Sequence, residues 1–294
     1  PGGFVEAICN IRKHYCNTSD DSINCMTLKS YKSDIPGWKK SMRIFKENPN
    51  IDIYYGNDGS GDLYKTENLI HLEKKMNNNK CDLVTADGGF DFSIDYNKQE
   101  ELSYRLIICQ IVAGISILKL NGHFVLKVFD NITKFSLKII YFLTTMFLTV
   151  NLVKPFTSRP ANSEKYIVCK NFLGINKSNL DELYSIIDDW EILSSQNKNV
   201  EDIFEFNLPI NFILSIKEYN MFILNRQLKN ILKTLTYIRI NLSNSDINYI
   251  KQNQAIIASL WCLKYGISIN YRCKFLKDNI EHYNYIPNFI NYQI

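Results

Sequence analysis

Short apolar runs separated by polar turns recur through the first 170 residues and have the length of β-strands. They occupy residues 23–28, 81–86, 123–128, 149–153 and 165–169. Segments with helical apolar spacing lie among them, at residues 4–14, 100–120 and 134–147. This alternation of strands and helices predicts a doubly wound α/β sheet with helices on both faces.

The last two predicted strands are joined by residues 154–164, a segment with no room for a helix. We therefore expect them to pair antiparallel, as a hairpin at the sheet edge. Asn121-Gly122 is expected to close the helix before it and to start the next strand. The longest apolar run, residues 139–153, is shorter than the roughly 20 residues that span a bilayer. It predicts a buried helix that runs into a strand.

Beyond residue 176 the pattern becomes helical. Helices are expected at residues 180–194, 211–240 and 245–265, and Pro209 is expected to break the chain before the second of them. We therefore predict two parts, a sheet domain over residues 1–176 and a mainly helical C-terminal extension over residues 177–294.

The composition limits the function classes only loosely. The chain has 294 residues, of which 46% are hydrophobic, enough to bury a sizeable core. A net charge of +4 permits an acidic partner such as RNA without specifying one. The eight cysteines form no CxxC pair, so neither a zinc site nor a disulfide scaffold is indicated, and a reducing compartment fits best.

Three polar residues stand at strand ends and form the candidate chemical site. Asp87 ends an apolar strand and is followed by two glycines. Lys127 lies inside the apolar strand FVLKVF, where an amine is costly unless it is paired or lines a cleft. Glu164 stands at the mouth of the hairpin. The plainer alternatives are a lysine that snorkels from an edge strand and a glutamate in a structural ion pair.

Further polar positions could bind a ligand. The Pro1-Gly2-Gly3-Phe4 segment precedes a helix, where glycines let backbone amides approach a ligand, although an isolated segment of this kind is more often an ordinary turn. Asp62 lies within an acidic glycine loop over residues 54–69 and is equally compatible with a solvated turn. Phe90, Phe92 and Tyr96 could stack on a base, or belong to the core.

Six strings carry a resemblance to a known family. In chain order they are PGGFVEA, CMTLK, GDLYKTENL, ADGGF, GHFVLKVFD and KPFTSRPANSEKYIVCK. Together they resemble the eukaryotic and viral cap-specific mRNA 2′-O-methyltransferases of the cap 1 type, within the FtsJ-like (RrmJ) fold. The resemblance runs from residue 1 to about residue 171 and continues weakly to about residue 267. The first string alone is weak, whereas the last is highly specific.

The resemblance implies transfer of a methyl group from S-adenosylmethionine to the ribose 2′-hydroxyl of the first transcribed nucleotide. The family uses a Lys-Asp-Lys-Glu tetrad, and Asp87, Lys127 and Glu164 match its last three members. The first lysine and the first strand of the fold are expected before residue 1, so the chain as given is expected to lack one catalytic residue. By resemblance, residues 1–4 border the methionine part of the cofactor, Asp62 its adenine, and Asp87 both the cofactor and the reaction.

The resemblance also implies contacts with the capped 5′ end of mRNA. The candidate RNA-binding residues are Lys154, Ser158, Arg159 and Asn97. Asn97 lies in the segment 91–99, which differs from the family pattern on the cap-binding side. No metal and no membrane are implied, and a link to the transcription or capping machinery follows from the family. A nuclear protein is expected, or a cytoplasmic one if the protein is viral.

Two other functions remain open at this point. One is an FtsJ-like 2′-O-methyltransferase of ribosomal or transfer RNA, whose activity would not depend on the cap. The other is a catalytically silent RNA-binding module that has kept the fold. The joint presence of Asp87, Lys127 and Glu164 argues against the silent module.

Overall fold

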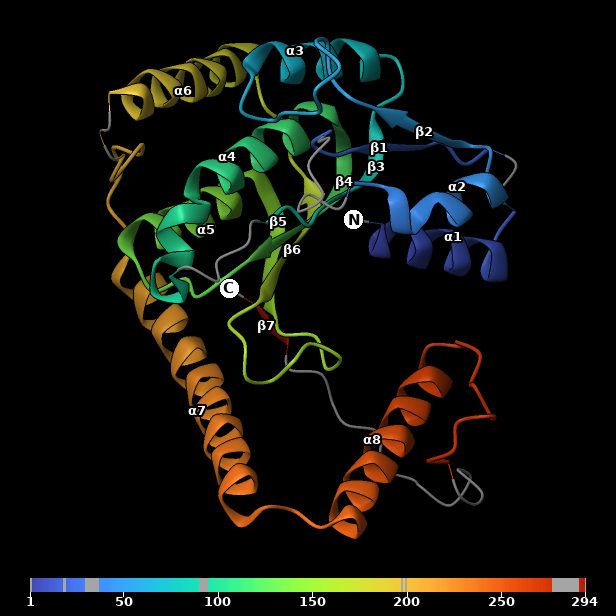
Figure 1. The fold of residues 1–294 in the computed structure, drawn as a ribbon. Helices are drawn as coiled ribbons and strands as arrows, with labels where there is room; N and C mark the ends of the chain where they lie inside the picture. The colour runs from blue at the N-terminus through green and yellow to red at the C-terminus, as the bar shows by residue number, and fades with distance from the viewer. Residues whose placement is uncertain are drawn as a thin grey trace.

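The strands of the chain form two sheets in a computed structural model that describes residues 2–17, 20–29, 37–89, 95–196, 198, 200–276 and 291–293 (Figure 1). Five strands pair in the order β3-β4-β6-β5-β7, and β1 pairs with β2 separately. The strands are β1 (Ile23–Met26), β2 (Ile51–Tyr54), β3 (Cys81–Ala86), β4 (Leu118–Val128), β5 (Phe147–Val153), β6 (Lys165–Phe172) and β7 (Asn291–Gln293).

The helices alternate with the strands through the first part of the chain and then follow one another. They are α1 (Gly3–Tyr15), α2 (Met42–Glu47), α3 (Thr66–Met76), α4 (Gln99–Ile117), α5 (Lys134–Met146), α6 (Lys177–Ser195), α7 (Ile210–Ile240) and α8 (Asn244–Lys264), with short 3₁₀ turns η1 (Lys39–Ser41) and η2 (Tyr96–Lys98). The predicted strands and helices are confirmed to within a few residues at their ends, except that β4 begins at Leu118 and not at residue 123. β2, β7, α2 and α3 were not predicted.

The predicted hairpin is confirmed, and its position in the sheet is more specific than expected. β5 and β6 pair antiparallel, and β6 also pairs antiparallel with β4. The second strand of the hairpin therefore lies between the first strand and the rest of the sheet. β5 pairs on its other side with the three-residue β7. The apolar run 139–153 is, as predicted, a helix that passes directly into a strand.

One face of the large sheet carries the core. Phe124 and Leu126 of β4 and Ile167 and Cys169 of β6 are fully buried on this face. α4 packs closely against it, because a Cβ atom added to Gly114 would lie 2.7 Å from the Phe124 ring. On the opposite face Val125, Lys127, Tyr166 and Val168 are only partly buried, and α1 approaches that face. The predicted site residue Lys127 therefore lies on the less covered side of the sheet.

The prediction that Asn121-Gly122 closes a helix is wrong. α4 ends at Ile117, and both residues lie within β4. Asn121 has a positive φ of 63°, and the β3–β4 register shifts at this point. A Cβ on Gly122 would lie 2.9 Å from the carbonyl oxygen of Lys119. The Asn-Gly pair thus makes an irregularity inside a strand, which uses the same left-handed backbone as a helix end.

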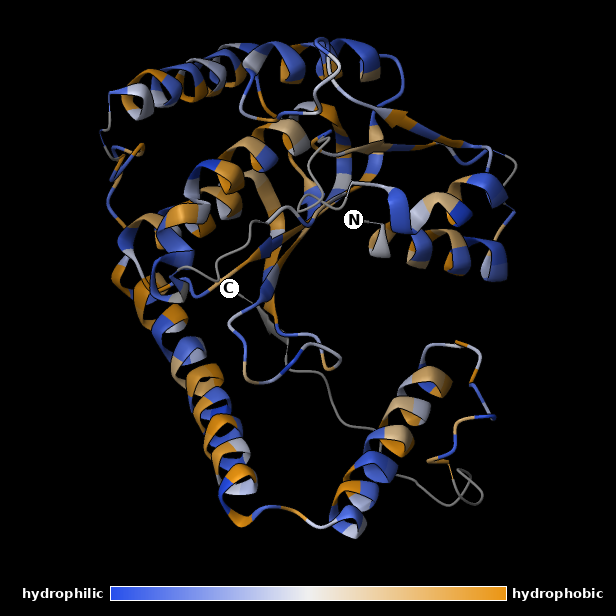
Figure 2. Cartoon of the chain, viewed as in Figure 1, coloured by the Kyte–Doolittle hydropathy of each residue, from blue (hydrophilic) through white to orange (hydrophobic). Residues whose placement is uncertain are grey.

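The C-terminal helices differ in how they join the core. α6 buries Leu183, Ile187 and Trp190, and the Trp190 ring meets the Phe135 ring of α5 edge-on at 5.9 Å. α7 begins directly after Pro209, as predicted, and its last buried residue is Ile223. Beyond that point it projects from the sheet with apolar and polar positions alternating along it (Figures 1 and 2). Among the described helices, none is long and apolar enough to cross a membrane.

Candidate functional site

Lys127 and Asp87 form an ion pair at the carboxyl edge of the sheet. Asp87 follows the last residue of β3, and Lys127 is the penultimate residue of β4. These strands are parallel, so their carboxyl ends meet. Lys127 Nζ lies 2.9 Å from Asp87 Oδ1 and donates to the Asp87 carbonyl oxygen at 3.0 Å. The lysine side chain is 14% exposed and the aspartate 47%, so the amine is shielded while the carboxylate reaches solvent.

Gln110 of α4 holds the loop that carries Asp87. It was not predicted from the sequence as a site residue. The Gly88 backbone N–H donates to Gln110 Oε1 at 2.7 Å. A Cβ on Gly88 would lie 2.6 Å from that oxygen, and one on Gly89 would lie 3.3 Å from Lys127 Nζ. A side chain at Gly88 would therefore displace Gln110, whereas one at Gly89 would require only a small shift of the Lys127 amine. The available signal was a buried glutamine in the otherwise apolar stretch of α4.

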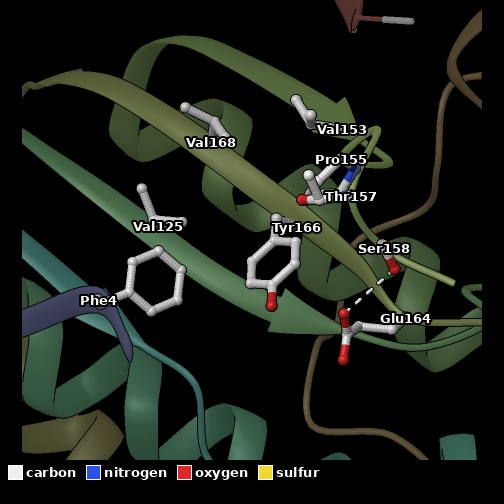
Figure 3. Close-up of a pocket in the computed structure, with 9 residues that line it drawn as sticks. All are labelled: Phe4, Val125, Val153, Pro155, Thr157, Ser158, Glu164, Tyr166 and Val168. Carbon is white, nitrogen blue, oxygen red and sulfur yellow. Dashed lines mark hydrogen bonds between the residues drawn. The ribbon is translucent and has the colours of Figure 1, made fainter. Parts of the chain in front are cut away.

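Glu164 lies directly before β6, at the end of the hairpin loop. The Ser158 hydroxyl donates to Glu164 Oε1 at 3.3 Å (Figure 3). In the cross-strand register Lys127 is opposite Tyr166, two residues beyond Glu164. Among the described residues, Asp87 and not Glu164 forms the ion pair with Lys127. The structure therefore brings the three predicted residues to one edge but joins only two of them directly.

Tyr166 lies opposite Lys127 in the strand register and was not predicted as a site residue. Burial raises the pKa of its phenol well above the ordinary value, and the charges of Asp87 and Glu164 and a hydrogen bond with Glu164 raise it further. The phenol therefore stays protonated and can donate to a carboxylate. Its ring meets the Phe4 ring edge-on, with centroids 5.8 Å apart. This contact places the start of α1 beside the ion pair.

A cavity of about 370 Å³ opens on this face of the sheet (Figure 3). Its walls include Phe4, Val125 and Tyr166, and Ser158 and Glu164 stand on its hairpin side. Apolar walls with a few polar groups are typical of small-molecule sites, and the volume lies within their usual range. The arrangement can accept a flat apolar group with a hydrogen-bond donor directed at the carboxylate.

Asp62 belongs to a separate, tightly bonded loop between β2 and α3. Asp62 Oδ1 accepts from the Tyr64 backbone N–H at 2.9 Å. The fully buried Asn68 donates from Nδ2 to the Asp62 carbonyl oxygen at 2.9 Å and to Asp58 Oδ1 at 3.0 Å. Hydrogen bonds from Lys65 and Ser60 hold the pKa of the Asp58 carboxyl well below its usual range. These hydrogen bonds give the loop a defined conformation, which fixes the position of Asp62.

The remaining predicted residues lie apart from the ion pair or outside the described ranges. Arg159 and Asn97 are exposed, whereas the Lys154 amine points into its own loop. Pro1, Phe90 and Phe92 lie outside the described residues, as does the Tyr96 side chain. Within the described ranges, no group of three His, Cys, Asp or Glu side chains could hold a metal ion.

A family comparison agrees with this geometry. The model of the FtsJ-like methyltransferase family matches residues 1–172, more than half of the chain. The chain belongs to the FtsJ-like methyltransferase family. The match ends at the last residue of β6, so it covers the ion pair and the hairpin but not the helices that follow.

Several relatives of this FtsJ-like methyltransferase chain carry the name cap-specific mRNA (nucleoside-2′-O-)-methyltransferase 1. The protein from Dictyostelium discoideum is 36% identical over 180 residues, which cover 60% of this chain and 23% of that protein. The mouse protein is 36% identical over 228 residues, covering 75% and 26%. The human protein is 34% identical over 227 residues, covering 74% and 26%. The chain thus spans about a quarter of the length of these relatives.

A solved structure is also similar, at a lower level. It is a putative ribosomal RNA methyltransferase from Plasmodium falciparum, with a TM-score of 0.36 and 18% sequence identity. The match covers 59% of this chain and 98% of the other.

Lys165, at the start of β6, is expected to make the stability of the FtsJ-like methyltransferase domain depend on pH. It is 2% exposed, and burial lowers its pKa to about 8 despite the nearby carboxylates of Asp130 and Glu100. The unfolded chain keeps this proton up to about pH 10.4. Between these two values the unfolded state binds more protons, so this lysine makes the free energy of unfolding rise with pH, and below pH 8 its burial cost stays constant.

We therefore expect Lys165→Met to flatten this rise. Between pH 7.5 and 9 the stability of the wild type should gain about 1 kcal/mol relative to the variant, as linkage with these pKa values gives. Urea unfolding at both pH values measures the difference. Lys170→Met, which removes an exposed lysine from the same strand, is the control. If the free energy of unfolding changes equally with pH in the wild type and in Lys165→Met, Lys165 titrates normally.

Proposed function

We propose that this chain is the methyl-transfer domain of a cap-specific mRNA 2′-O-methyltransferase. The enzyme would transfer a methyl group from S-adenosylmethionine to the ribose 2′-hydroxyl of the first transcribed nucleotide, converting cap 0 to cap 1. The observation that carries the proposal is the shielded Lys127–Asp87 pair with Glu164 at the same sheet edge. Family membership and the names of the relatives support it.

The proposed roles follow from the needs of the reaction. A ribose hydroxyl is a weak nucleophile at neutral pH, so a base or hydrogen-bond acceptor must direct its proton. Lys127 is the proposed residue. Its amine must be uncharged to accept that proton, and the carboxylate and carbonyl oxygens of Asp87 hold it in place. Glu164 would orient the substrate side of the site together with the Tyr166 phenol. Holding the hydroxyl in line with the methyl donor supplies a large part of the remaining acceleration.

The residues proposed for the cofactor fit S-adenosylmethionine, which supplies an electrophilic methyl group. A Cβ added to Gly3 would meet no atom within 4 Å, so the backbone at the start of α1 is open to a ligand. The Asp87 carboxylate is half-exposed and Asp62 is partly exposed. Such carboxylates accept hydrogen bonds from an amine or a ribose. We propose that Gly2, Gly3 and Phe4 border the methionine part, with Asp62 on the adenine side.

We further propose that the substrate is the capped 5′ end of mRNA. The exposed Arg159 and Asn97 are the proposed RNA contacts, together with Ser158, which lines the cavity with Glu164. We propose residues 1–176 as the sheet domain and residues 177–294 as a mainly helical extension, whose α6 packs on the domain and whose β7 adds to the sheet edge. Action in the nucleus near the capping or transcription machinery follows from this role, or in the cytoplasm for a viral protein.

A direct assay tests the proposal. Full-length protein is incubated with labelled S-adenosylmethionine and either capped or uncapped RNA of one sequence, and the first nucleotide is analysed for 2′-O-methylation. We expect transfer to the first ribose of capped RNA only. Equal transfer to uncapped RNA would instead support a methyltransferase of ribosomal or transfer RNA. RNA binding without any transfer would support a silent binding module.

A further inference from the structure

The Lys154 ammonium is the centre of the hairpin loop that carries Glu164. Lys154 follows the last residue of β5, so it stands at the opposite end of the loop from Glu164. Its Nζ donates to Ser158 Oγ at 3.0 Å, to the Asn162 carbonyl oxygen at 2.9 Å and to the Glu164 carbonyl oxygen at 2.7 Å. The Asn162 side-chain oxygen is a fourth acceptor. One group therefore ties the middle and the far end of the loop to its start.

These bonds hold Glu164 at two points. The Glu164 carbonyl oxygen accepts directly from Lys154. The carboxylate is held indirectly, because the Ser158 hydroxyl accepts from Lys154 and donates to Glu164 Oε1. The loop backbone adds only short turn bonds of its own, from Ser158 to Pro155 and from Asn162 to Arg159. The position of the carboxylate thus depends on the ammonium as well as on the Tyr166 phenol.

We propose that Lys154 is a positioning residue that sets the place of Glu164 for methyl transfer, and that it is not a phosphate contact. An ammonium has three N–H donors, and here four oxygen acceptors surround it. No donor is left for a phosphate without breaking a bond that holds the loop. This inference rests on the proposed function, since it assigns a role in the same site.

The electrostatics of the loop agree with an internal role. Burial is the main cause that lowers the pKa of Lys154 to about 8, and the positive charge of Lys165 lowers it further. The negative charge of Glu164 raises it, Arg159 lowers it, and Asp130 raises it. A half-buried ammonium beside a second cation is costly. Such a group needs the loop acceptors for its own stability, whereas a phosphate-binding lysine would lie in solvent.

The test separates positioning from phosphate binding by salt dependence. In the full-length protein, Lys154→Met is expected to lower kcat for capped RNA at least tenfold. The affinity for capped RNA and the slope of log affinity against log salt should match those of the control Lys170→Met, which removes an exposed lysine from β6. Lys154→Arg is expected to restore the charge but not kcat, because a planar guanidinium cannot serve the same four acceptors.

Opposite results would overturn the inference. If Lys154 is instead a phosphate contact, Lys154→Met would weaken RNA binding uniformly and reduce the salt slope by about one, with kcat unchanged. Lys154→Arg would then restore the affinity for RNA. If Lys154→Met does not fold, Asn162→Ala removes one acceptor only, and a smaller loss of kcat at unchanged RNA affinity is expected. A normal kcat in Asn162→Ala would count against the positioning role of Lys154. An inactive wild type would refute the proposed function, whereas an active wild type with a fully active Lys154→Met refutes this inference alone.

Discussion

Replacing Lys127 with alanine is expected to lower the rate of methyl transfer by about a hundred- to ten-thousandfold, the range typical of losing a general acid–base group. Its amine is the one held against Asp87 by an ion pair of 2.9 Å and a carbonyl contact of 3.0 Å, at the point where the ribose hydroxyl is proposed to lie. Single-turnover transfer to capped RNA measures the rate, and an RNA-binding assay is expected to show little change.

The same two strands provide a matched control for this prediction. Lys119 of β4 forms an ion pair with Asp82 of β3, near the opposite end of both strands from Lys127 and Asp87. Lys119 is half-exposed, so Lys119→Ala should leave transfer unchanged while removing the same charge from the same strand. Wild-type rates in Lys127→Ala would show that this amine does not act on the hydroxyl.

Replacing Gly61 with alanine is expected to weaken S-adenosylmethionine binding at least about tenfold, equivalent to about 1.4 kcal/mol. Gly61 has a positive φ of 71°, and a Cβ there would lie 1.9 Å from the carbonyl oxygen of Thr27, just beyond β1. The loop must therefore move away from β1, and the neighbouring Asp62 moves with it. Calorimetric titration with the cofactor measures the loss of affinity.

Gly59 separates the effect of backbone strain from that of the clash. Its φ is also positive, at 73°, but a Cβ there would meet nothing within 4 Å. Gly59→Ala therefore adds only the strain of a left-handed residue, about 1–2 kcal/mol, without pushing the loop off the strand. Cofactor affinity close to wild type is expected. Equal losses in the two variants would show that the contact with Thr27 does not place Asp62.

The local sequence pattern could not predict some helices and strands, because they are buried by residues that are distant in the sequence. α3 has no side-chain cap at its start and many charged residues, and its apolar side is buried at Leu69, Leu72 and Met76. β2 is only four residues long and carries Asp52. Asn121-Gly122 was misread because a left-handed backbone suits both a helix end and a strand irregularity, and only the pairing with β3 distinguishes them.

The residues of the candidate site also differ in whether the sequence could predict them. Asp87 and Lys127 could be predicted as neighbours, because both stand at the carboxyl ends of strands that a βαβ unit makes parallel. Gln110 and Tyr166 could not, since each is one polar residue in an apolar stretch and its role depends on a loop or strand far away in the sequence. The pattern also suggested that Lys154 faces RNA, and nothing local to the loop showed that its ammonium turns inward.

The amino-acid sequence by itself determined the alternation of the main strands and helices, the antiparallel hairpin and the three polar residues at strand ends, because alternation, chain length and strand ends are local properties. Only the tertiary structure decided that Lys127 pairs with Asp87 rather than Glu164, and that Lys154 is enclosed by its own loop. The physical reason is that an ammonium takes its partners from the nearest oxygens in space, and those distances exist only once the strands have paired.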